Sequence, residues 1–115
     1  MPSVFTGNPC HEELVARVRE LKTFFYATYG DPSQQDFNVD QEIGDNPLSI
    51  QVVTKARDAY ALLRSKFVNG SDAEKKELRA YETCLQEVAS FIGAGWIMHL
   101  HPAVDILVDV VENGV

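Results

Sequence analysis

The sequence contains no lysine or arginine before Arg17 or after Arg79. Within the range from Arg17 to Arg79, residues 31–46 also lack lysine and arginine. Residues 31–46 and residues 80–115 therefore both carry acidic side chains without a lysine or an arginine. Because the net charge of the whole chain is −7, the protein repels the phosphate backbone of a nucleic acid, and we expect no direct nucleic-acid binding. The uneven charge predicts either a face that attracts a basic partner or two halves that complement each other within the fold or across a dimer.

Cysteine is scarce as well: Cys10 and Cys84 are the only two, and they lie far apart in the sequence. Residues 1–8 lack the basic and apolar regions of a secretory signal. We therefore expect both thiols to be reduced, Cys84 to be a small buried residue, and the protein to be cytoplasmic.

An uninterrupted apolar run that could span a membrane is missing. The longest candidate, residues 91–111, is broken by Asp105, Asp109, Pro102 and two histidines. Because each of the two charges would lie in hydrocarbon, at a high cost in free energy, we expect no association with a membrane.

Motifs that carry catalysis or hold a cofactor are also missing. The nucleophile pattern G-x-S-x-G, the phosphate-binding P-loop and the zinc patterns H-E-x-x-H and C-x-x-C do not occur. We therefore expect a protein that is not an enzyme and that needs no cofactor.

Helix signals are plentiful. Asn8-Pro9 and Asn46-Pro47 each combine a capping side chain with a proline suited to the first helical turn, and Ser71 and Glu74 form a capping-box pattern. The three helices that follow are expected to end at Gly30, at Asn69-Gly70 and at Gly93. Their apolar positions recur at steps of three and four: Leu14, Val18, Leu21, Phe25 and Thr28; Val53, Ala56, Tyr60, Leu63 and Phe67; Leu78, Tyr81, Leu85, Val88 and Ile92.

A fourth helix is expected to begin near Pro102 or one turn earlier, with His99 and His101 in the turn before it. Its acidic residues share one stripe and the rest of its surface is apolar, which is typical of a helix that is buried on several sides or covers a partner. The sequence thus predicts one all-α domain, residues 1–115: a compact four-helix bundle with one long acidic loop between its first two helices. A helical turn within residues 32–36 would make a fifth helix, and the C-terminal helix is a candidate surface for a homodimer.

Two groups of residues are candidates for metal binding. His99, His101 and Asp105 offer ligands for zinc, but a spacing of two places the histidines about 200° apart around a helix. Asp31 and Glu42 match positions 1 and 12 of a calcium-binding loop, whereas its sixth position lacks the required glycine. We therefore predict no metal site and keep a metal-binding helical protein that uses His99, His101 and Asp105 as an alternative.

Aromatic residues exceed what one interior stripe can bury, because Tyr26 lies about 100° from Phe25 around a helix. Exposed aromatic side chains are typical anchors of protein interfaces. We therefore predict a small non-catalytic protein-binding module, an adaptor, inhibitor or regulatory protein, whose partner is another protein with a basic surface. An acidic mimic of nucleic acid is a further alternative. The expected binding residues are Tyr26, Tyr29, Asp36, Phe37, Asp40, Glu42 and Trp96.

Overall fold

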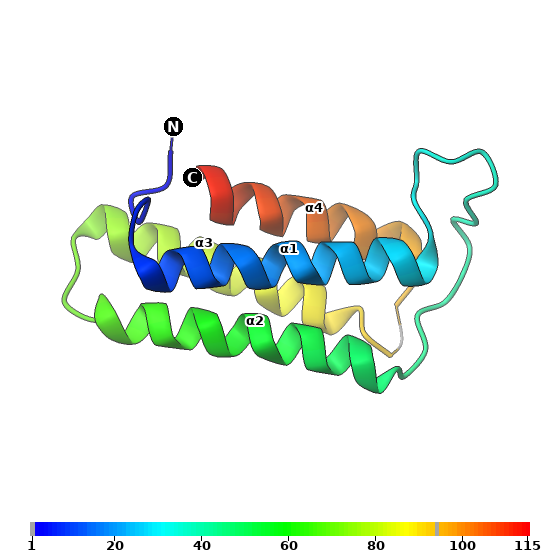
Figure 1. The fold of residues 1–115 in the computed structure, drawn as a ribbon, viewed down its shortest axis with the longest axis horizontal. Coiled ribbons are helices and arrows are strands. Elements are labelled where there is room, and N and C mark those ends of the chain that lie inside the picture. The colour runs from blue at the N-terminus through cyan, green and yellow to red at the C-terminus, as the bar shows by residue number, and fades with distance from the viewer. Residues whose placement is uncertain (1, 94) are drawn as a thin grey trace.

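The part of the chain described by the structure, a computed structural model covering residues 2–93 and 95–115, folds into four α-helices without a β-strand (Figure 1). The helices are α1 (Pro9–Tyr29), α2 (Pro47–Lys66), α3 (Asp72–Ser90) and α4 (Ile97–Asn113). This confirms the predicted all-α fold with four helices. Residues 32–36 form turns rather than a fifth helix.

The three predicted N-terminal caps are confirmed. The side-chain oxygens of Asn8 and Asn46 accept hydrogen bonds from N–H groups in the first turns of α1 and α2. At the start of α3, Ser71 and Glu74 each accept a hydrogen bond from the other's backbone N–H, which completes the capping box. These bonds satisfy donors that the first turn of a helix cannot pair internally, and they therefore fix where each helix begins.

Several predictions of helix boundaries need correction. α2 ends at Lys66 instead of Asn69, because the N–H of Phe67 already turns back to bond the carbonyl of Arg64 at 3.1 Å. Helix α3 likewise ends before the expected glycine, at Ser90. The earlier of the two expected starts of α4 is right, and the histidines consequently lie inside α4 rather than in the turn before it.

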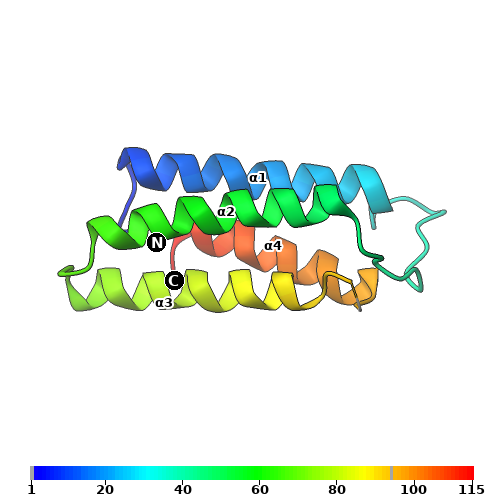
Figure 2. The same ribbon diagram turned by 90° about the horizontal axis from the view of Figure 1, so that it is seen from below.

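The helices pack in a ring, in which α1 contacts α2 and α4, and α3 contacts the same two helices (Figure 2). The predicted stripes supply the interior, and Leu14, Leu63, Leu85 and most of the other stripe positions are buried. Phe67 and Ile92 are partly buried, and Thr28 is exposed. From α4, the core gains Ile97, Leu100, Ala103, Val104, Leu107 and Val111.

A buried carboxylate holds the N-terminal segment on the bundle. Glu77 is 2% exposed and accepts hydrogen bonds from the hydroxyl groups of Ser3 and Tyr81 and from the N–H of Val4. A buried charge is costly unless it is hydrogen-bonded, and these three donors meet that requirement. Burial, with the bond to Glu77 as the second cause, raises the pKa of the Tyr81 phenol. Residues 3–5 are thereby fixed at the end of the bundle farthest from the connection between α1 and α2.

Two neighbouring residues of α4 test this packing. Leu107 is fully buried, whereas Ile106 is 54% exposed. We expect Leu107→Ala to lower the free energy of unfolding by about 2–5 kcal/mol, because it leaves a cavity in the core. Ile106→Ala, the matched control, is expected to change it by about 0.5 kcal/mol or less. Urea-induced unfolding followed by circular dichroism measures both free energies. Equal losses would contradict the assignment of Leu107 to the buried side of α4 and of Ile106 to its exposed side.

Candidate functional site

The connection between α1 and α2, residues 30–46, is fastened to the start of α4. The Ile43 N–H donates a hydrogen bond to the Gly95 carbonyl at 2.9 Å, and the Ile97 N–H donates one to the Gln41 carbonyl at 3.0 Å. The Ile43 side chain is fully buried between these bonds. In addition, the Gln41 side-chain amide donates to the carbonyl of Tyr29 at 2.6 Å. The connection, visible at one end of the bundle (Figure 1), is therefore held against the core near its C-terminal end, at residues 41–43.

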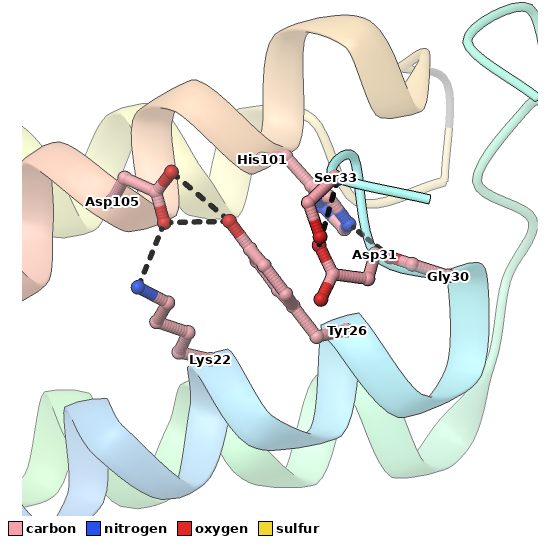
Figure 3. Close-up of polar contacts among 7 residues, drawn as sticks. All are labelled: Lys22, Tyr26, Gly30, Asp31, Ser33, His101 and Asp105. Atoms are coloured by element: carbon pink, nitrogen blue, oxygen red, sulfur yellow. Dashed lines mark hydrogen bonds and ion pairs between the residues drawn. The ribbon is translucent and has the colours of Figure 1, made fainter. Parts of the chain in front are cut away.

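His101 joins the other half of this connection to α4. Its ring is 2% exposed and stacks on Tyr26, with ring centroids 4.4 Å apart and planes 9° apart, and on Phe37 at 5.5 Å. Its Nε2 lies 2.8 Å from the carbonyl of Gly30 (Figure 3). Because a carbonyl only accepts, Nε2 carries the proton; the buried Nδ1 has no hydrogen-bond partner within the described residues. The imidazole thus connects α1, the connection and α4.

A polar contact borders this stack on the α1 side. The Tyr26 hydroxyl donates to both oxygens of the Asp105 carboxylate, at 2.9 and 3.0 Å, and Lys22 Nζ lies 3.2 Å from the same carboxylate (Figure 3). Burial is the largest cause that raises the pKa of Tyr26, and together with the bond to Asp105 and its negative charge it brings that pKa to about 12. Lys22, the last basic residue before the connection, is therefore already neutralised within the fold.

A shallow apolar cavity of about 260 Å³ opens where the connection meets α4. Two of its lining side chains, Val39 and Met98, are 47% and 50% exposed; Trp96, directly before α4, is 41% exposed but is not part of the lining. Large apolar side chains that are half exposed and gathered around one hollow are typical of binding surfaces. The cavity is lined by Pro32, Phe37, Val39, Ile97, Met98, His101, Pro102 and Asp105.

The charged side chains of the connection beside this cavity are all acidic, and the one acidic lining residue, Asp105, pairs with Lys22. Asp36, Asp40 and Glu42 are exposed, and none of them forms an ion pair with a described residue. Hydrogen bonds from the backbone and then the hydroxyl of Ser33 lower the pKa of Asp31, which keeps its carboxylate ionised. The site, called the acidic end below, is therefore an apolar hollow with an anionic border.

The predicted binding residues separate into two groups in the structure. Tyr26, Tyr29 and Phe37 are partly buried and pack inward; Tyr29 stacks on Phe25 with centroids 5.9 Å apart. Trp96 points outward, as do the acidic residues of the prediction, Asp36, Asp40 and Glu42.

Sequence reasoning missed Val39 and Met98. Val39 lies between Asn38 and Asp40, and Met98 lies between Ile97 and His99. Neither residue belongs to an apolar pattern with helical spacing that the sequence analysis used. The local signal that could have found Met98 is its position one residue after the buried Ile97, which turns it to the outer surface of α4.

The structure does not bring the candidate zinc ligands together. His99 is exposed and stacks on Phe91 with centroids 5.7 Å apart, whereas His101 is buried beneath Phe37. Residues two apart point to nearly opposite sides of a helix, so the two rings face different surroundings. Across residues 2–93 and 95–115, no group of three or more His, Cys, Asp or Glu side chains is arranged to hold a metal ion, and this includes the calcium-loop pattern that starts at Asp31.

No known protein-family model matches the chain, and comparisons with curated proteins and with solved structures gave no match either. Among the described helices, none combines the length and the apolar character needed to cross a membrane. The function must therefore be inferred from the surfaces of this structure.

The pKa of Tyr26 leads to a prediction about alkaline stability. Because its folded pKa of about 12 exceeds the ordinary value of 10.0, the folded protein holds this proton more firmly than the unfolded chain. The associated stability is fully present below pH 10 and is lost as the pH rises toward 12. The unfolding free energy of Tyr26→Phe should therefore fall less steeply across this range than that of the original protein. Urea unfolding at closely spaced pH values measures both slopes, and parallel curves would contradict the raised pKa of Tyr26.

Proposed function

We propose that this protein is a small non-catalytic binding module, and that its acidic end binds a partner protein through an exposed segment with an apolar residue flanked by lysine or arginine. The observation that carries the proposal is the apolar cavity at Val39 and Met98, with an anionic border and no basic residue between Gly30 and Thr54. Such a surface favours an apolar side chain with positive charge on either side.

The two parts of this surface have different physical roles. Exposed carboxylates raise the rate of encounter with a basic partner, but each contributes little to affinity because water and salt screen it. Affinity comes from apolar side chains that lose water on binding, which is why a few central residues dominate most interfaces. Val39, Met98 and Trp96 are the exposed candidates for that role. Tyr26 supports the lining residue His101 by stacking on it.

The rigidity of the site supports the same proposal. Backbone bonds to Gly95 and Ile97 hold residues 41–43 of the connection, and the His101 stack holds its beginning. A binding loop that is already ordered loses less conformational entropy when a partner docks, so more of the contact energy appears as affinity.

Self-association through α4 is the second candidate. Met98 and Ile106 are 50% and 54% exposed on this helix. However, Asp105 and Asp109 are exposed on the same helix, and both would approach their counterparts in a symmetric dimer. We therefore rank a separate basic partner above a second copy.

Met98→Asp tests the proposed function directly. The probe is a fluorescein-labelled peptide with a central leucine flanked by lysines, and fluorescence anisotropy measures its affinity. We expect Met98→Asp to weaken binding about tenfold or more, because it places a charge in the apolar hollow. Ile106→Asp is the matched control, since it makes the same substitution at a similarly exposed position of α4 outside the cavity, and it should leave affinity nearly unchanged.

The acidic border makes a separate contribution to this experiment. Reversing Asp36, Asp40 and Glu42 to lysine should slow peptide association and remove most of its salt dependence, with a smaller effect on dissociation. Equal affinities of the original protein and Met98→Asp would sink the proposal. Sedimentation that shows a dimer dissociated by Ile106→Asp would favour self-association instead.

A further inference from the structure

A second hollow runs along the opposite part of the molecule, between α2 and α3. Two adjoining cavities of about 430 and 290 Å³ share Tyr60, Arg64, Val68 and Glu82 in their linings, so they form one continuous groove. On α2 the groove extends from Arg57 to Ser65, which corresponds to about 12 Å, and Val68 extends it beyond the end of the helix.

The packing of the bundle explains why this groove exists. Helices α2 and α3 pack less closely than any other neighbouring pair. Ala61 is too small to fill the space between them, and the floor is formed by the buried side chains of Tyr60, Leu78 and Leu85. The Tyr60 hydroxyl donates to the Leu78 carbonyl at 3.0 Å, so it is satisfied within the fold and its ring presents an apolar surface. Val68, 65% exposed, extends that surface at one end.

The walls of the groove are positively charged. Its lining contains four basic residues and one acidic residue, Glu82, which lies 4.0 Å from Arg64. The other three basic residues form no ion pair within the described residues. The four basic residues are Arg57, Arg64, Lys75 and Arg79.

The basic residues of α1 behave differently, because the fold already neutralises them. Arg17 pairs with Glu13 and Glu20 on its own helix. Arg19 and Lys22 pair with Glu112 and Asp105 of α4. In a chain with a net charge of −7, the basic side chains that form no ion pair within the described residues therefore all lie on α2 and α3.

We propose that this groove docks an acidic amphipathic helix of a partner protein. Apolar residues of that helix would lie on Tyr60, Ala61 and Val68, and its carboxylates would meet Arg57 and Arg79 at the walls. Arginine forms paired hydrogen bonds with carboxylates, and an amphipathic helix about three turns long matches the groove in length and in chemistry. This partner is independent of the basic segment proposed for the acidic end.

The groove suits an acidic helix better than the two other occupants that its charge would attract. A nucleic-acid strand would bring phosphates to Glu82 at the centre, and would find only two aromatic rings, Tyr60 and Phe67, on which its bases could stack. A second copy of the chain would have to supply a free acidic helical face. The acidic stripe of α4 does not offer one, because Asp105 and Glu112 already pair with α1.

The experiment uses the full chain and three fluorescein-labelled probes. The first is a helical peptide of about three turns, with leucines on one face and glutamates on the other. The second has the same charge but serine in place of leucine, and the third is a single-stranded oligonucleotide of equal charge. We expect the first peptide to bind at least about tenfold more tightly than either of the others, because only it satisfies both the floor and the walls.

Variants matched in charge locate the binding. Arg57→Glu combined with Arg79→Glu should weaken binding of the leucine peptide about a hundredfold. The control, Lys66→Glu combined with Lys76→Glu, makes the same change in charge on the same two helices but outside the groove lining, and should weaken binding less than about threefold. Circular dichroism and thermal unfolding confirm that each variant is folded.

The proposal is overturned by equal binding of the leucine and serine peptides, by tighter binding of the oligonucleotide, or by equal losses in the two double variants. Sedimentation of the protein alone is the remaining measurement. A dimer that Arg57→Glu dissociates would show that a second copy fills the groove. A failure at the acidic end is distinguishable from a failure here, because Met98→Asp should not affect this peptide.

Discussion

The acidic end depends on two backbone hydrogen bonds between residues 41–43 and residues 95–97. They fasten the connection between α1 and α2 to the start of α4, and Ile43 is buried between them. Val39 and Met98 lie more than fifty residues apart in the sequence. This short pairing is what brings their two segments together, so that both side chains line one cavity. Backbone hydrogen bonds can join the two segments in this way because each bond satisfies one N–H and one C=O group, whatever side chains the residues carry.

A second constraint determines which charges remain available to a partner: it is the distribution of the ion pairs, rather than the number of charged residues. The ion pairs between α1 and α4 neutralise Arg19 with Glu112 and Lys22 with Asp105 at the surface. The basic side chains left without an ion pair among the described residues lie on α2 and α3, and the charged residues of the connection are all acidic. Exposed pairs of this kind contribute little to stability. Their consequence for function is larger, because they determine which charges are left for a partner.

The helices could be predicted because their signals are local. Asn8 and Ser71 cap the helices that begin directly after them, and the apolar stripes need only the periodicity of the chain. The surfaces could not be predicted in the same way. The exposure of Met98 and the burial of Glu77 depend on contacts with segments distant in sequence, and Glu77 is buried only because Ser3 lies beside it in the folded chain.

His101 illustrates the boundary between the two kinds of inference. Helical spacing correctly indicated that it faces away from His99, which argued against a shared metal ion. The same spacing contains no information about its other neighbours. Only the folded connection places Phe37 over one face of the ring and the Gly30 carbonyl at its Nε2.

The two proposed surfaces can act independently because of the shape of the bundle. The molecule is 45 Å long, and the acidic connection lies at one end while the turn between α2 and α3 lies at the other (Figure 1). At physiological ionic strength, the field of exposed charges decays over about 8 Å. A basic partner at one end and an acidic helix in the groove would therefore bind without strong mutual effects. Opposite charges at the two ends would also favour head-to-tail association of copies of the chain. However, the proposed occupant of the groove is a helix with an apolar face, and the acidic connection is not a helix. That mismatch in shape, rather than charge, is what would keep copies of this chain from filling each other's grooves.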